Sequence, residues 1–211
     1  MTNFTLSLFE HRVPAGTALT LSAANRVLYV VDGTAKVASP HGAAALGTNS
    51  AWCSPAAVTI DSPAGATLLA WELQRAGAAS SDGRLVLAAP VALDPAQSYL
   101  MRGDRVDFPI GGVAYKHRHQ GPGIRRLLHG SMRVDTQGAQ HDHAPGEAWF
   151  ESGPDPVFAA ASSREETAFV RCMILPLALK GKSSISYVDA ADKDKPKTQR
   201  YQVFIDFPIQ L

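Results

Sequence analysis

Two histidines, His117 and His119, form the part of this sequence that is best suited to chemistry. They are two residues apart, so in an extended strand both imidazoles point to the same side. The run Gly121-Pro122-Gly123 ends that strand, and residues 124–129 are expected to form the next one. Two neutral imidazoles on one face can begin a metal site. The alternative is a polar pocket that holds no metal.

The spacing around the pair resembles the first motif of the cupins, a superfamily of small double-stranded β-helix barrels. That motif reads Gly, five residues, His-x-His, three or four residues, Glu, six residues, Gly. Gly111, His117, His119 and Gly130 fall on these positions. The glutamate position, however, falls on Gly123.

The second cupin motif reads Gly, five residues, Pro-x-Gly, two residues, His. Counted from Gly146, its proline falls on Ser152 and its histidine on Val157; counted back from Gly153, the histidine falls on Pro156. Neither alignment supplies a third histidine. The resemblance therefore implies a cupin barrel in which half of the usual metal-ligand set is visible.

Other side chains near the second motif could complete a metal site. Glu151 carries the carboxylate that Gly123 cannot supply, and its alternative role is a surface carboxylate at a turn. His141 and His143 form a second His-x-His pair, whose alternative role is an exposed polar edge. We expect the metal ligands to be His117 and His119, with Glu151 and His143 as further candidates. Glu147 matches the acidic turn position that is common in cupins, which implies a structural role.

Arg125 lies two residues after Gly123, so strand alternation predicts that its side chain points into the same barrel. A buried guanidinium is costly unless it meets an anion, which would be Glu151 or the carboxylate of a bound substrate. Arg125 is therefore a candidate substrate-binding residue. The alternative is a bulge after Gly123 that turns Arg126 inward instead.

The first half of the chain contains a second copy of the pattern. Residues 30–37 (VVDGTAKV) match residues 127–134 (LLHGSMRV) at an offset of 97, and Ala51-Trp52 matches Ala148-Trp149 at the same offset. Leu73 matches Val170 in the same way, which indicates two copies of one unit. At this offset Thr20 and Ser22 stand where the second copy has its histidine pair, so the first copy is expected to bind no metal.

Short apolar runs between evenly spaced Gly and Pro residues favour many short strands. With the resemblance, this predicts an all-β chain of two double-stranded β-helix, jelly-roll-like cupin barrels. We expect an N-terminal cupin-like barrel at 1–80. A C-terminal cupin barrel at 81–211 would include a final strand at 201–207, which could return to the sheet of the first barrel.

Composition limits the partners. Hydrophobic residues make up 45% and charged residues 18%, with a formal net charge of +1, so neither nucleic acid nor a membrane is expected. Two cysteines are too few for a disulfide scaffold. The amino terminus lacks a basic start and a long apolar core, so we expect a cytoplasmic protein without a signal peptide. A homodimer is left open.

The resemblance implies a metal-dependent enzyme that acts on a small organic molecule, possibly a carboxylate, with one divalent ion (Fe, Mn, Ni, Co or Zn). Non-haem dioxygenation is the first expectation, and lyase, decarboxylase or isomerase activity is open. The rival hypothesis is a non-catalytic small-molecule-binding or sensor protein, which the missing glutamate and third histidine favour.

Overall fold

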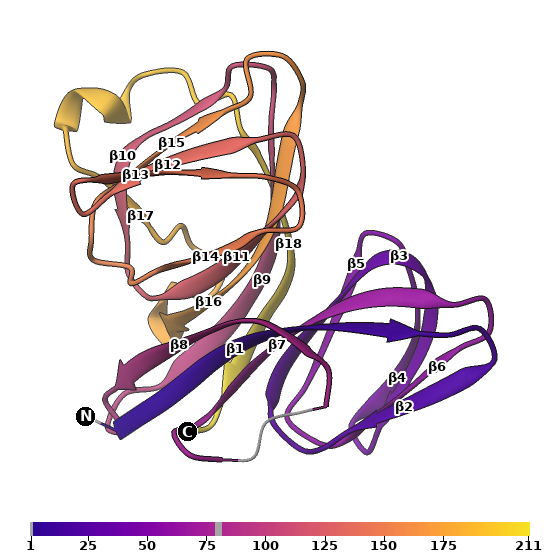
Figure 1. Ribbon diagram of the computed structural model, residues 1–211. Helices are drawn as coiled ribbons and strands as arrows, with labels where there is room; N and C mark the ends of the chain where they lie inside the picture. The colour runs from indigo at the N-terminus through magenta and orange to yellow at the C-terminus, as the bar shows by residue number, and fades with distance from the viewer. Residues whose placement is uncertain (1, 79–81) are drawn as a thin grey trace. The chain divides into compact units, whose positions relative to one another are not determined.

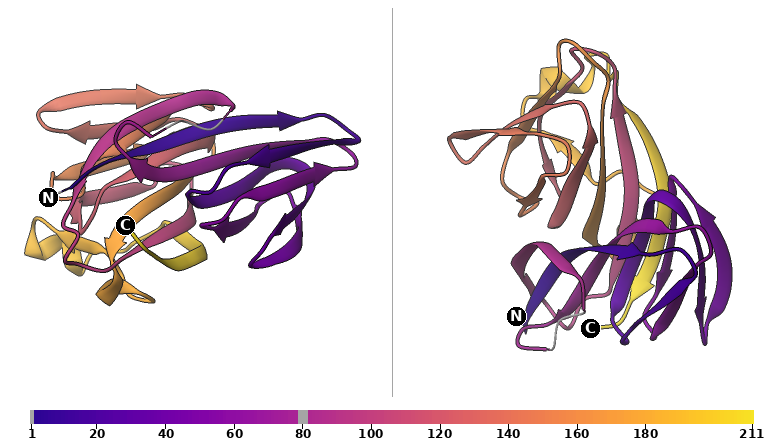
Figure 2. Two further views of the ribbon diagram at one scale, coloured as in Figure 1. Left: turned by 90° about the horizontal axis from the view of Figure 1, so that it is seen from below. Right: turned by 45° about the vertical axis from the view of Figure 1, so that its right-hand side comes forward.

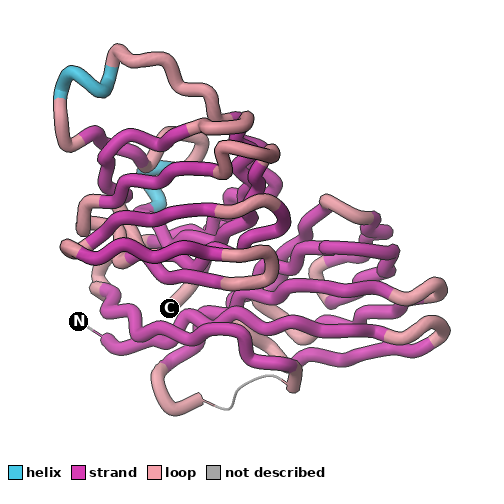
Figure 3. Tube along the Cα trace, turned by 45° about the horizontal axis from the view of Figure 1, so that its top comes forward, coloured by secondary structure: helices cyan, strands magenta, loops and turns pink. Residues whose placement is uncertain are grey.

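The structure is a computed structural model that describes residues 2–78 and 82–211. The regular elements of its described part are antiparallel strands and two short 3₁₀ helices (Figure 3). The predicted all-β class is therefore confirmed. None of the helices in the described part of the chain has the length or apolar character of a membrane span.

The chain divides into two compact units, residues 1–101 with 207–211 and residues 102–206. The first unit is built on an eight-stranded sheet in the order β2-β6-β3-β7-β1-β8, with β4 and β5 paired to β3 (Figure 1). The strands are β1 (Thr2–Val13), β2 (Thr17–Leu21), β3 (Asn25–Ser39), β4 (Gly42–Gly47), β5 (Ser50–Ser54), β6 (Val58–Ser62), β7 (Ala66–Arg75) and β8 (Arg84–Leu93).

The second unit contains two five-stranded sheets, β13-β12-β15-β10-β17 and β14-β11-β16-β9-β18 (Figures 1 and 2). Apolar residues from both sheets form one buried cluster, so the sheets face each other across a shared core. The elements are β9 (Tyr99–Phe108), β10 (Val113–His119), β11 (Gly123–His129), β12 (Met132–Thr136), β13 (Ala139–His143), β14 (Ala148–Glu151), β15 (Val157–Ala161), β16 (Thr167–Pro176), η1 (Leu177–Leu179), β17 (Ile185–Tyr187), η2 (Ala190–Lys193) and β18 (Arg200–Ile209).

The expected boundary between the two units lay after residue 80, whereas the observed boundary lies after residue 101. Strand β8 pairs with β1 from Thr2↔Leu93 to Glu10↔Arg84, and so it belongs to the first unit. The final strand, β18, extends the sheet of the second unit beside β9, and only residues 207–211 are grouped with the first. Composition cannot show either point, because a strand is assigned by its hydrogen-bond partners.

Strand register supports the repeat and also corrects it. Leu28 pairs with Trp52 on β5, and Arg125 pairs with Trp149 on β14, so both partners keep the offset of 97. On the other side, Leu28 pairs with Ala70 and Arg125 with Arg171, an offset of 101. The expected match of Leu73 to Val170 is therefore displaced by four residues.

The expected counterparts of the histidine pair are also displaced. Val37↔Ile60 and Val134↔Ala159 are equivalent pairs, which makes Val58 the counterpart of Val157. Leu21 pairs with Val58 as His117 pairs with Val157. The counterpart of His117 is therefore Leu21, whereas Thr20 and Ser22 are exposed. The cause is one extra residue in the second barrel, since His117 lies eight residues before Arg125 and Leu21 lies seven before Leu28.

Candidate functional site

The histidine pair lies at the end of β10, held by a strand on each side. His117 pairs with Val157 on β15 and with Tyr187 on β17. The backbone N–H of His119 donates to the carbonyl oxygen of Gly153 over 2.8 Å. Both imidazoles are buried, and their Nε2 atoms are 3.2 Å apart. The alternation predicted for this strand thus directs both rings to one point.

The hydrogen bonds around the rings determine which nitrogen faces the site. His117 Nδ1 lies 2.7 Å from the carbonyl oxygen of Tyr115, which can only accept, so this nitrogen carries the proton when the ring is neutral. Its Nε2 then presents a lone pair toward His119. His119 Nδ1 lies 3.2 Å from Ser184 Oγ, a hydroxyl that can accept or donate.

Burial keeps both imidazoles neutral. It lowers the pKa of His117, and it lowers the pKa of His119 well below the ordinary value, with Arg171 and Arg125 acting in the same direction. Neutral imidazoles with a lone pair on Nε2 are the form that binds metal ions.

A guanidinium and a carboxylate occupy the region where the cupin motif has its glutamate. A Cβ at Gly123 would lie 2.6 Å from the carbonyl oxygen of Cys172 and 3.1 Å from Arg125 Nη1, so the backbone would have to move to accept a glutamate there. Arg125 Nη1 donates to the carbonyl oxygen of Gly123 over 2.6 Å. Glu151 pairs with Gly123 from the neighbouring strand. The carboxylate therefore comes from β14 instead of β11.

Arg125 and Glu151 form a buried ion pair. The side chain of Arg125 points inward, as alternation predicts, and its Nη2 lies 2.6 Å from Glu151 Oε2. Arg126 is buried as well, but the strand pairing is regular from Gly123 to Arg126, so the alternative of a bulge that turns Arg126 inward in place of Arg125 is wrong. Trp149 Nε1 donates to Glu151 Oε1 over 2.9 Å, while Oε2 lies 3.7 Å from His119 Nε2. Burial lowers the pKa of Arg125 to about 10, and Glu151 limits the decrease.

Arg171 and Asp104 form a second buried ion pair, which was not predicted from the sequence. Arg171 Nε and Nη2 donate to the two carboxylate oxygens of Asp104 over 2.7 and 3.1 Å. The remaining nitrogen, Nη1, lies 3.5 Å from His119 Nε2. Burial acts to lower the pKa of Arg171, but Asp104 outweighs it and the pKa is raised. The available signal was a lone arginine inside the apolar run 169–175.

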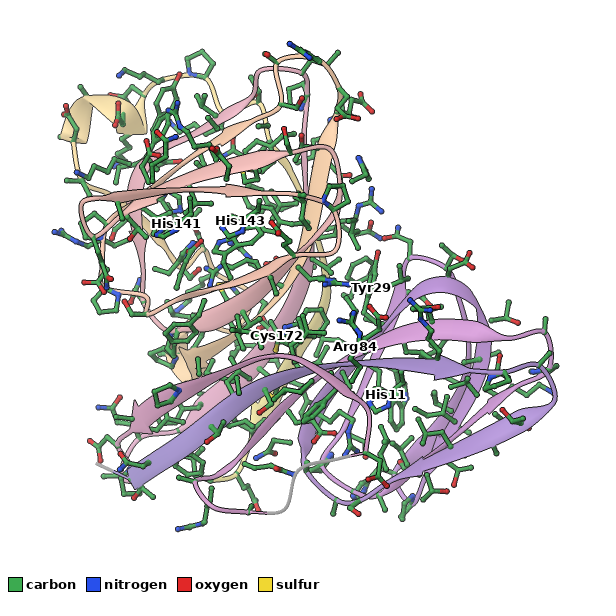
Figure 4. The ribbon with its side chains drawn as sticks, viewed as in Figure 1. His11, Tyr29, Arg84, His141, His143 and Cys172 are labelled. Atoms are coloured by element: carbon green, nitrogen blue, oxygen red, sulfur yellow. The ribbon has the colours of Figure 1, made fainter. Side chains whose placement is uncertain are left out.

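The other candidate histidines lie elsewhere. The His143 ring stacks on Trp149, with 4.6 Å between ring centroids, and His143 Nδ1 lies 4.0 Å from Glu147 Oε2. His141 is exposed, and Figure 4 shows both histidines on β13. His143 is therefore not brought together with the pair on β10. Its contact with Trp149 links it only indirectly to Glu151.

The donor atoms present fit part of a metal site. Two nitrogens bound to one tetrahedral Zn²⁺ are roughly 3.3 Å apart, close to the 3.2 Å between the two Nε2 atoms. Glu151 is the carboxylate beside them. Within residues 2–78 and 82–211, however, no group of three His, Cys, Asp or Glu side chains is arranged to hold a metal. The two imidazole nitrogens thus have a ligand-like separation, whereas the Glu151 carboxylate is paired with Arg125.

Solved structures resemble this fold. A single-residue variant of the Bacillus subtilis oxalate decarboxylase matches with a TM-score of 0.69 and 10% identity, over 91% of this chain and 73% of that chain. AerE from Microcystis aeruginosa matches with a TM-score of 0.59 and 12% identity, over 83% of this chain and 88% of that one. The chain has the fold of a bicupin.

This fold agrees with the first cupin motif on β10 and β11. At such low identity the likeness to solved cupin structures concerns the fold alone. No described family of protein sequences matches this chain, and no curated protein matches it either. The function must therefore be argued from the side chains of the second barrel.

Proposed function

We propose that this chain is a metal-dependent cupin enzyme that acts on a small organic anion in its second barrel. The observation that carries the proposal is the histidine pair, two buried neutral rings whose Nε2 atoms are 3.2 Å apart. Burying two polar rings side by side is costly, so a ligand that both rings bind is a physical reason for the pair. The first barrel has Leu21 at the corresponding position.

His117 and His119 would hold the metal, and Glu151 is the nearest carboxylate to join them. When bound, the metal would act as a Lewis acid toward the substrate and could support oxygen chemistry. Arg171 and Arg125 place two guanidiniums beside the pair, where they can orient an anionic substrate. His117 Nδ1–H donates to the backbone carbonyl oxygen of Tyr115, which keeps that ring oriented.

We also propose an order in which to test the possible reaction classes. Dioxygenation by a non-haem metal is the first to test, followed by decarboxylation, lyase and isomerase chemistry. One of the similar structures is that of the Bacillus subtilis oxalate decarboxylase, which has Mn(II) centres. This supports including Mn²⁺ with Fe, Ni, Co and Zn among the metals to test.

Metal content tests the proposal directly. Protein purified without a histidine tag should contain about one divalent ion per chain by elemental analysis, or take one up when it is reconstituted. The double variant His117→Ala, His119→Ala should bind none. The control is Thr20→Ala with Ser22→Ala, two exposed residues of the first barrel, and its metal content should equal that of the wild type.

Oxygen uptake and substrate turnover by the loaded protein then separate the reaction classes. Wild-type protein that stays metal-free after reconstitution with each ion would overturn the enzyme proposal.

A second candidate function is a non-catalytic small-molecule-binding barrel. One observation favours it: the buried charges already balance without a metal, since Arg125 pairs with Glu151 and Arg171 with Asp104. A divalent ion would add two positive charges to this balanced set. This candidate predicts ligand binding without metal uptake or turnover.

A further inference from the structure

A hollow of about 570 Å³ lies in the second unit beside the histidine pair. It is bounded by β9, β16, β17, β18 and the turn at 181–184, and all of its lining residues belong to that unit. Two of them reach the site, because Arg171 Nη1 and Ser184 Oγ both contact the His119 ring. The volume is within the range that holds a small organic ligand.

Two tyrosine rings give the hollow flat apolar walls. Tyr187 and Tyr201 both line it, and Tyr201 and Val203 remain 44% and 54% exposed. The Tyr201 ring is held in place from two sides. The Arg171 guanidinium lies 5.8 Å from the ring centroid, and Gln199 Nε2 donates to the hydroxyl over 3.0 Å. A fixed, exposed ring offers a stacking surface at little entropic cost.

The charge around the hollow is positive. Arg102 and Arg171 are paired with Asp206 and Asp104, the two carboxylate residues of the lining. Two lysines of the lining, Lys182 and Lys197, add positive charge that these carboxylates do not balance.

Lys197 lies 4.7 Å from the centroid of the Tyr187 ring, and its Nζ donates to the backbone carbonyl oxygens of Asp192, Lys193 and Lys195. These contacts use its three N–H donors but supply no formal negative charge. An anionic ligand would supply the missing negative charge.

We infer that this hollow binds a flat aromatic carboxylate, with its ring against Tyr201 and Tyr187 and its carboxylate toward Arg171 Nη1. The flat ring follows from the two tyrosines, and the carboxylate from the excess positive charge. In this position the carboxylate lies next to the His119 ring. That this ligand is a substrate rests on the proposed function, whereas binding in the hollow does not.

Calorimetric titration with 2-naphthoate tests the inference on the full chain after treatment with a chelator. We expect binding, and 2-naphthamide, which has the same ring without the charge, should bind at least about tenfold more weakly. Tyr201→Ala should weaken naphthoate binding by roughly tenfold, because a stacked ring pair is lost. Tyr201→Phe should bind like the wild type, since the ring is kept.

The matched control is Gln202→Ala, the next residue on β18, which does not line the hollow and should leave the affinity unchanged. Equal affinity for the amide, an unchanged affinity in Tyr201→Ala, or no naphthoate binding by folded wild-type protein would each overturn the inference. Metal content is measured on separate untreated samples. A failure of metal binding therefore counts against the proposed function alone, and a failure of naphthoate binding against this inference alone.

Discussion

The two barrels pair their strands alike and fill their interiors differently. Interior positions that carry charge or imidazole in the second barrel are apolar in the first, where Leu28 stands for Arg125, Ala70 for Arg171 and Leu21 for His117. Leu21, Leu28 and Ala70 belong to one buried apolar cluster. The same backbone pattern therefore places an apolar cluster at these positions in one unit and a polar centre in the other.

This difference shows that the fold does not require the polar centre. A buried arginine must be compensated by a partner, and a leucine at the same place needs none. The polar residues of the second barrel are thus better explained by function than by stability.

The first barrel also has a buried ion pair, so buried charge by itself does not distinguish the second barrel. Arg26 Nε donates to Glu72 Oε1 over 2.7 Å, and both side chains are fully buried. Arg26 stands at the counterpart of Gly123. What separates the second barrel is the combination of two ion pairs with a histidine pair at one point.

Replacing Arg125 by its first-barrel counterpart should have the largest effect on stability. Arg125→Leu leaves Glu151 buried without its cation, so we expect the free energy of unfolding to fall by about 3–5 kcal/mol. Urea denaturation followed by tryptophan fluorescence measures the change.

The double variant Arg125→Leu, Glu151→Ser recreates the first-barrel pair Leu28 and Ser54 and should recover more than half of that loss, because both charges are removed together. A double variant as unstable as the single one would mean that the ion pair is not the cause.

Breaking the pair in the first barrel should affect stability without affecting the site. Glu72→Gln removes the charge that compensates Arg26, and we expect a loss of about 2 kcal/mol in the same denaturation assay. Metal content and 2-naphthoate affinity should stay at the wild-type level. Glu151→Gln is the matched change in the second barrel and should lower the metal content. If Glu72→Gln also lowered it, the two barrels would not be functionally separate.

The smallest effect is expected from pH. Burial lowers the pKa of His11 in the first barrel and of His117 in the second below the ordinary value of 6.5. The unfolded chain therefore takes up protons first as the pH falls. Stability from these groups is complete above about pH 6.5 and is lost as the pH falls through the lower folded-state values.

Urea denaturation of chelator-treated protein at several pH values between about 7.5 and 5 should show this decrease. His11→Gln in the first barrel and His117→Gln in the second should each make the free energy of unfolding less dependent on pH. A stability that rises toward acid would contradict neutral burial of these rings.

Local pattern alone determined the all-β class, the common direction of His117 and His119 and the inward direction of Arg125. It also located one side of the repeat, from Leu28 with Trp52 to Arg125 with Trp149. These features follow from the period of two along a strand, which is a property of consecutive residues.

Only the tertiary structure decided which distant side chains meet. It brought Glu151 to Arg125, joined Arg171 to Asp104 across β16 and β9, and left His143 on Trp149. It also made Leu21 the counterpart of His117, because the segment from His117 to Arg125 is one residue longer than the segment from Leu21 to Leu28. The reason is that register and strand order are set by hydrogen bonds and packing between segments far apart in the chain, and no local period encodes them.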